Sequence, residues 1–385
     1  MVKALQPSGG GKQNPICCDK EMKARGGKAF NWFFVVARGI AVLATAAVAV
    51  WLAREAHWHQ VKMLDLFWLG IVPLVPLTLL LAPHLWRNVC PLAVFSLAGA
   101  RFGQHWREIR RARLPRKTAI WVKRYGVTLA ACTLWLLVPM RLLLFNESAQ
   151  ATLVLILMIV LATLALGLFG SHKETWCSSL CPIYPVEKFY GSAPMWTFRD
   201  ARCAPASLAQ SCYRCALHCL DVPATDTRYW AAMERAGTAR ASEAFRRFFL
   251  ASFPGFVLAY WLLSATEKFR SSFRGAPFLA VYGTFLLLML GSYGSYRLAE
   301  FVISRRGSQR SPLAHRRLSL IMIALAINLY YGASSAGIST LLARLAGSSG
   351  EMSIIRAGIL GIVFLTSLLW LSRAWSILTS PWTRW

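Results

Sequence analysis

Acidic side chains are scarce in this chain of 385 residues: 16 Asp and Glu stand against 43 Lys and Arg, giving a formal net charge of +27. Charged residues make up only 15% of the sequence and hydrophobic residues 56%, with a mean hydropathy of +0.45. This composition excludes an ordinary soluble domain and is typical of an integral membrane protein. In such a chain the excess of Lys and Arg indicates cytoplasmic loops rather than nucleic-acid binding.

Other features are also missing. The first residues (MVKALQPSGGGKQNP) contain no apolar core followed by a small-residue cleavage site, so no cleaved signal peptide is expected. None of the seven histidines lies well inside an apolar segment, and no Cys-x-x-Cys-His sequence occurs. Electron transfer across a membrane through haem is therefore not expected.

Eight apolar segments are present, each long enough to cross about 30 Å of hydrocarbon. They lie at 31–53, 63–83, 124–145, 151–170, 247–265, 277–297, 318–341 and 352–373. The N-terminal tail and the segments near 101–117 and 305–317 are rich in Lys and Arg, whereas the intervening loops are shorter and poorer in charge. The positive-inside rule then places both termini in the cytoplasm. The predicted fold is an all-α, multi-pass integral membrane protein.

Four parts follow from these spans: a cytoplasmic tail (1–30), four helices as repeated hairpins (31–170), a cytoplasmic segment (171–246) and a second four-helix membrane region (247–385). The segment between helices 4 and 5 is too short for a large apolar core. A small lobe held together by a cofactor is the natural solution for such a segment. We expect a ferredoxin-like iron–sulfur lobe there.

The first half contains an internal repeat. Helices 1 and 2 lead into PHLWRNVCPL (83–92), and helices 3 and 4 lead into SHKETWCSSLCPI (171–183). Aligning Cys90-Pro91 with Cys181-Pro182 also brings a histidine and a tryptophan close to register, although Trp86 stands where the second copy has Cys177. Sites in membrane proteins tend to lie where such repeats meet.

Six cysteines crowd into the cytoplasmic segment, at positions 177, 181, 203, 212, 215 and 219. Disulfides are unlikely to persist in the reducing cytoplasm, and thiolates suit zinc or iron–sulfur clusters. Cys215-x3-Cys219 resembles the end of the bacterial cluster run C-x2-C-x2-C-x3-C-P, whereas structural zinc normally uses two cysteine pairs. We therefore expect Cys203, Cys212, Cys215 and Cys219 to bind one [4Fe–4S] cluster as metal ligands. Zinc and redox-switching thiols are the alternatives.

A second cofactor site has fewer candidate ligands. Two four-iron clusters need eight thiolates, and the cytoplasmic side offers seven once Cys90, Cys177 and Cys181 are added, unless Cys17 or Cys18 completes the set. The simpler hypothesis is one full cluster, with Cys90, Cys177 and Cys181 beside it as an incomplete second ligand set or as redox thiols.

The hairpins ending in Cys177-Ser-Ser-Leu-Cys181-Pro182, followed by a cysteine run of ferredoxin type, resemble the membrane polyferredoxins. This family includes the quinol-dehydrogenase subunit of periplasmic nitrate reductase and the regulator of nitrous-oxide reductase. The resemblance covers roughly residues 30–225; Trp86-Arg-Asn-Val-Cys90-Pro91 matches a copy without its first cysteine. Members usually carry two ferredoxin motifs, where this chain has one imperfect copy. The resemblance implies a bacterial inner-membrane protein that transfers electrons.

The sequence therefore predicts an inner-membrane iron–sulfur protein that passes electrons between the quinone pool or a cytoplasmic donor and a partner oxidoreductase. A quinone head group could bind near His84 and His172. The basic inner face could bind anionic membrane lipid and steer an acidic redox protein such as a ferredoxin or flavodoxin. The alternatives are a metal-handling or assembly factor and a scaffold subunit of a larger redox complex.

Three residues inside the apolar segments need explanation. Cys132 is expected to be a buried free thiol that packs as a small apolar residue. Arg38 and Arg141 are expected to extend toward the membrane interface, where their charge stays in water.

Overall fold

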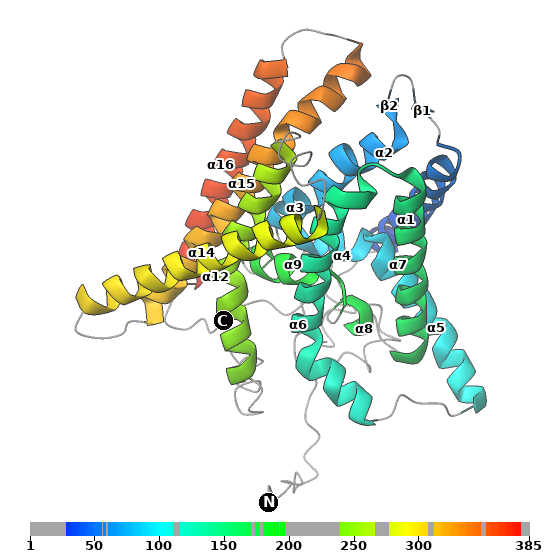
Figure 1. Cartoon of the computed structure of the whole chain (residues 1–385). Helices are drawn as coiled ribbons and strands as arrows, with labels where there is room; N and C mark the ends of the chain where they lie inside the picture. Colours follow the sequence, from blue (N-terminus) through cyan, green and yellow to red (C-terminus); the bar gives the residue numbers. More distant parts are fainter. Residues whose placement is uncertain are drawn as a thin grey trace, which may run out of the picture.

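All of the long elements in the structure, a computed structural model, are helices (Figure 1). The structure describes residues 28–55, 57–58, 61–110, 116–170, 174–177, 180–191, 193, 195–196, 239–265, 277–306, 312–347 and 352–378. Within these ranges the only strands are β1 (His57–Trp58) and β2 (Val61–Lys62), which pair antiparallel. The all-α prediction is confirmed for this part of the chain.

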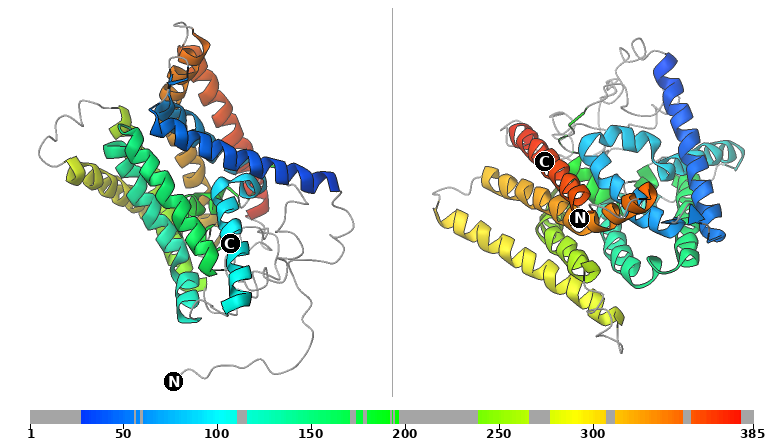
Figure 2. Two further views of the ribbon diagram at one scale, coloured as in Figure 1. Left: turned by 90° about the vertical axis from the view of Figure 1, so that its right-hand side faces the viewer. Right: turned by 90° about the horizontal axis from the view of Figure 1, so that it is seen from above.

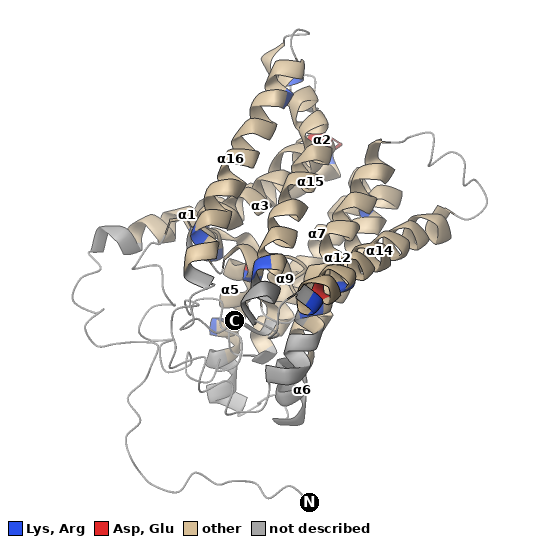
Figure 3. Ribbon diagram, turned by 90° about the vertical axis from the view of Figure 1, so that its left-hand side faces the viewer, with Lys and Arg blue, Asp and Glu red and all other residues tan. Residues whose placement is uncertain are grey.

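Eight helical segments of the described chain are long and apolar enough to cross a membrane. They are Trp32–Ala53, Met63–Leu81, Tyr125–Phe145, Ala149–Leu168, Arg247–Ala265, Pro277–Arg305, Arg317–Ala346 and Met352–Ser376. The predicted number of spans is therefore confirmed, and the sixth and seventh are longer than expected. Their ribbons carry few charged residues in Figure 3, and many of their large apolar side chains face outward, as lipid contact requires.

The first span is α1 (Lys28–Ala53), and two of the next spans change helix type. The second consists of α2 (Met63–Asp65), the π-helix η2 (Leu66–Ile71) and α3 (Val72–Leu81). The third consists of α6 (Arg116–Met140) and the π-helix η3 (Arg141–Phe145), which begins two residues after Pro139. Proline interrupts the regular backbone hydrogen bonds, and π turns in long helices often mark functional positions.

The basic segment after the second span is helical, whereas the sequence predicted a loop. It forms α4 (Pro83–Val89) and α5 (Pro91–Arg110), and its Leu, Ala, Arg and Glu residues favour helices. α5 packs along α7 (Ala149–Gly170). A Cβ atom on Gly99 would lie 2.3 Å from the Leu164 carbonyl, and one on Gly167 would lie 2.3 Å from the Ser96 carbonyl. Two glycines therefore allow these backbones to touch.

The C-terminal half is a second group of helices, α12 (Ala239–Ala265), α14 (Pro277–Arg306), α15 (Pro312–Ala346) and α16 (Met352–Leu378). α12 packs on α14 and α15, and α15 packs on α16 (Figure 2). These helices contain no cysteine, and the resemblance noted in the sequence does not extend to them.

The main apolar core joins this half to the repeat. It brings Leu79 of α3, Phe189 of α9 (Tyr184–Tyr190), Phe249 of α12 and Trp370 of α16 into one cluster. Hydrogen bonds fix α9 at the centre: the Tyr190 hydroxyl donates to the Ile323 carbonyl at 3.0 Å, and the Trp370 indole donates to the Tyr190 carbonyl at 3.0 Å. The C-terminal helices therefore hold the segment that directly follows Cys181.

Candidate functional site

Cys90 lies at a helix break that its own sequence creates. α4 ends there because the following Pro91 disfavours helical geometry at the preceding residue, and Cys90 accordingly has ψ of 121°. Its backbone N–H still donates to the Trp86 carbonyl at 2.7 Å. Pro91 then starts α5 at a position where a missing N–H costs nothing.

The second Cys-Pro motif has the same local arrangement. α8 (Glu174–Cys177) ends shortly before Cys181, whose backbone N–H donates to the Trp176 carbonyl at 3.1 Å. The Tyr184 N–H then donates to the Cys181 carbonyl at 3.0 Å, and α9 begins. In both repeats the cysteine before proline thus lies in a turn between two helices.

Cys90 and Cys177 lie near enough to Cys181 for their charge to act on it; we refer to the three residues as the cysteine trio. Cys181 is 7% exposed and packs with Trp176 and Tyr184, and Cys177 lies at the edge of the same cluster. Burial raises the pKa of the Cys181 thiol well above its ordinary value; negative charge on Cys177, on Cys90 and on Glu187 raises it further, and a backbone hydrogen bond from Ile183 opposes the rise. The turns that carry Cys90 and Cys181 are therefore neighbours in the structure, and their role as ligands stays a prediction.

A buried ion pair connects the two repeats beside the trio. The Nε of Arg87, in α4, donates to Oε1 of Glu187, in α9, at 2.5 Å, and the two side chains are 5% and 7% exposed. Gly191 leaves room for it: a Cβ atom there would lie 3.0 Å from Nη2 of Arg87 and 2.6 Å from the Glu187 carbonyl.

Arg38 also contributes to this junction. Its Nε donates to the Asn88 carbonyl at 3.0 Å and its Nη2 to the Asn88 side chain at 3.1 Å. The first span is thereby attached to the turn that carries Cys90. Arg38 is half-buried and has a protein partner, so the expected extension toward the interface does not describe its main contact.

The trio has the chemistry of a soft-metal site but not a complete ligand set. The Trp176 indole N–H is buried, lies in the same cluster as Cys181 and has no acceptor among the described residues. No group of three His, Cys, Asp or Glu side chains within the described ranges is placed to hold a metal ion. A four-iron cluster is held by four thiolates, and the trio supplies three.

The remaining predicted ligands, Cys203, Cys212, Cys215 and Cys219, lie outside the described residues, as do His172 and most of the predicted 171–246 lobe. The backbone of His84 belongs to α4. The structure therefore places the repeat-junction cysteines and leaves the ferredoxin-type run a prediction.

Two predictions about side chains inside the spans were wrong. Cys132 is exposed on α6, because its side of that helix faces away from the bundle. Arg141 is only 6% exposed and points into the bundle, where its Nη2 donates to the Trp68 carbonyl at 2.9 Å and its Nε to Asn146 at 3.0 Å. The partners of Arg141 are distant in sequence or beyond the end of α6, so the hydropathy pattern could not reveal them.

Comparison of the chain with protein-family models, with curated proteins and with solved structures finds no match.

Proposed function

We propose that this protein is an iron–sulfur electron-transfer protein of the bacterial inner membrane. It passes electrons between the quinone pool or a cytoplasmic donor and a partner oxidoreductase, and belongs to the type of the membrane polyferredoxins that its Cys-Pro motifs resemble. The observation that carries the proposal is the convergence of the cysteine trio, from two sequence repeats, at one buried junction.

The ferredoxin-type run supplies the main cluster in this proposal. Cys203, Cys212, Cys215 and Cys219 hold a [4Fe–4S] cluster in a small cytoplasmic lobe, and the trio forms an incomplete second ligand set beside it. A bound cluster of this kind supplies reversible one-electron transfer. The basic inner face contacts anionic lipid and attracts an acidic carrier such as a ferredoxin or flavodoxin.

The residues around the trio orient its two turns and exclude water from it in this proposal. The buried Trp176 N–H, which has no acceptor in the described part of the chain, would donate to a sulfur of a bound cluster and stabilise negative charge there. The Arg87–Glu187 pair joins the helices next to the two turns. The Arg38–Asn88 hydrogen bonds attach the first span to the turn that carries Cys90. Burial of Cys181 keeps water away from its sulfur, which lowers the local polarity on which a cluster's potential depends.

The test is anaerobic purification of the full chain in detergent, followed by iron and acid-labile sulfide analysis and EPR of the dithionite-reduced protein. We expect iron and sulfide in equal amounts and a four-iron signal that Cys212→Ser and Cys215→Ser abolish. Cys181→Ser should lower the iron content if the trio holds metal. Cys132→Ser is the matched control and should change neither quantity, because Cys132 faces away from the bundle.

Zinc or copper bound in place of iron, without a reducible centre, would contradict the proposal and favour a metal-handling or assembly factor. A chain that binds no metal but co-purifies stably with a larger redox complex would instead favour a scaffold subunit.

A further inference from the structure

A cavity of about 300 Å³ lies within the bundle of membrane spans. Its walls come from both halves of the chain, and nearly all of its lining side chains are apolar. Pro182 and Ile183, which follow Cys181, line it, and so does Arg141 together with Trp68 and Tyr330. An apolar cavity with a few polar groups in one place is the usual form of a small-molecule site, and this volume is at the lower end of such sites.

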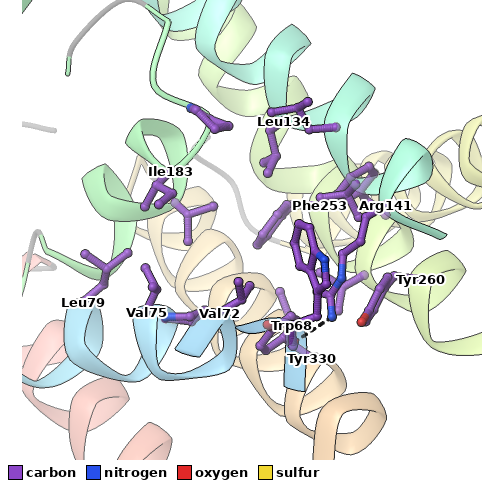
Figure 4. A pocket seen from close by; sticks show the side chains of 18 of the residues that line it. Trp68, Val72, Val75, Leu79, Leu134, Arg141, Ile183, Phe253, Tyr260 and Tyr330 are labelled. Carbon is purple, nitrogen blue, oxygen red and sulfur yellow. Dashed lines mark hydrogen bonds between the residues drawn. The ribbon is translucent and has the colours of Figure 1, made fainter. Parts of the chain in front are cut away.

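The polar groups of this cavity lie apart from the cysteine trio. Figure 4 shows Arg141 among Trp68, Tyr260 and Tyr330, with Ile183 across the cavity. Cys181 packs in one cluster with Ala130 of α6, and Arg141 follows Ala130 by 11 positions on the same span, or about 16 Å of helix. A ligand in the cavity therefore has a polar end near Arg141 and an apolar end toward the Cys181 turn.

The positively charged Arg141 side chain is buried. Two of its five N–H groups donate to the Trp68 carbonyl and the Asn146 side chain. The Cζ atom of Arg141 lies 4.6 Å from the centre of the Trp68 ring and 5.3 Å from the centre of the Tyr260 ring. The faces of these rings therefore supply part of the stabilisation of its charge.

No carboxylate among the described residues forms an ion pair with Arg141. Three described acidic side chains form ion pairs with other arginines: Glu187 with Arg87, Glu300 with Arg297, and Asp65 with Arg344. Burying a cation without an anion beside it is energetically costly. An ionisable residue inside a membrane is usually part of a functional site. The hydrogen bonds to Trp68 and Asn146 use two donors of Arg141. They do not explain the apolar cavity beside it.

We propose that the cavity binds a single-chain amphiphile with an anionic head, the head on Arg141 and the apolar chain running toward Ile183. A carboxylate matches the guanidinium in charge and in its two-pronged geometry. The apolar walls match the chain, and the small volume suits one chain rather than two. A neutral head group would leave the charge of Arg141 uncompensated. The site needs no iron, so it stands or falls independently of the proposed cluster.

The experiment measures binding of palmitate and of hexadecanol, which has the same chain with an uncharged head, to the delipidated full chain in detergent by native mass spectrometry. We expect palmitate to bind at least about tenfold more tightly, because a hydrogen bond to a charged group contributes more than one between neutral groups. Arg141→Gln should remove that preference. Arg344→Gln, an exposed arginine paired with Asp65, is the matched control and should preserve it.

Val138→Phe provides a second variant, since Val138 lines the cavity and the substitution fills it while Arg141 remains. It should weaken binding of both probes. Lysophosphatidylglycerol, which has one acyl chain, separates a lipid phosphate from a free carboxylate as the source of the anionic head, and binding of either that depends on Arg141 supports the site. Equal binding of palmitate and hexadecanol, a palmitate preference that survives Arg141→Gln, or tighter binding of the neutral decylubiquinone would overturn the proposal.

Discussion

Arg87 and Glu187 are 100 residues apart in the sequence and form a buried ion pair, with 2.5 Å between Nε and Oε1. Arg87 belongs to α4, the helix before Cys90, and Glu187 belongs to α9, the helix after Cys181. The pair therefore connects the helix before the first Cys-Pro motif with the helix after the second.

Breaking this pair should destabilise the protein strongly. Arg87→Gln or Glu187→Gln leaves one buried charge without its partner, and we expect a loss of about 3–5 kcal/mol in the free energy of unfolding. Replacing both by apolar residues of similar volume, as in Arg87→Met with Glu187→Leu, should recover most of that loss. Urea unfolding of the wild type, the single variants and the double variant in detergent measures these free-energy changes.

The exposed pair between Arg344 and Asp65, with 3.4 Å between its charged atoms, is the matched control. Arg344→Gln should cost less than about 1 kcal/mol, since water screens exposed pairs. Equal losses for Arg87→Gln and Arg344→Gln would show that the Arg87–Glu187 pair is not buried in the protein as isolated.

The eight spans could be predicted from the sequence because their signal is local. About 20 apolar residues in a row suffice to indicate a span, whatever the neighbouring helices do. The helix at Pro91–Arg110 could not be predicted, because the charges in its second half resemble those of a loop. Backbone contact with α7, which stabilises this helix, is not visible in the sequence. The partner of Arg87 is likewise invisible locally, since no periodic pattern joins positions 100 residues apart.

Close backbone contact between α5 and α7 should depend on Gly99. Gly99→Ala places a Cβ 2.3 Å from the Leu164 carbonyl, and backbone on both sides cannot yield easily. We expect a loss of about 1–3 kcal/mol in the free energy of unfolding. Gly39→Ala, at a helical position with nothing within 4 Å, should instead be neutral or stabilising by up to about 1 kcal/mol. Thermal melts of the two variants would contradict the α5–α7 contact if they shifted alike.

The stability of the metal-free protein should fall as pH rises above the ordinary thiol range. The folded protein holds the Cys181 proton more tightly than the unfolded chain does, because burial, and then Cys177, Cys90 and Glu187, raise the pKa of its thiol. The contribution is therefore fully present below about pH 8.5 and is lost as pH increases beyond it.

Comparing the wild type with Cys181→Ala between about pH 8 and about pH 10 isolates this effect from other groups that titrate there. The variant should show the shallower decline in melting temperature. Cys132→Ala should retain the wild-type slope, and a Cys181→Ala curve parallel to the wild type would show that Cys181 ionises freely in the folded protein.

The cysteine trio was only partly predictable from the sequence. Repeat alignment pairs Cys90 with Cys181, because both precede a proline that ends a helical turn. The unpaired indole of Trp176 and the burial of Arg141 arise from packing against distant helices, which a sequence pattern does not encode. The sequence also left the C-terminal helices without a role, although α15 and α16 hold α9 in place.

That role can be tested at Trp370, which is fully buried and donates to the Tyr190 carbonyl. Trp370→Ala should cost about 3–5 kcal/mol through the cavity it leaves, and Tyr190→Phe about 1 kcal/mol through one lost hydrogen bond. Because α9 follows the Cys181 turn directly, Trp370→Ala should also speed alkylation of Cys181 by iodoacetamide in the metal-free protein under native conditions. Leu287→Ala, a large substitution on the exposed surface of α14, is the control and should leave the alkylation rate unchanged. If Trp370→Ala lowers stability while Cys181 stays as unreactive as in the wild type, the C-terminal helices stabilise the fold without holding the cysteine turn.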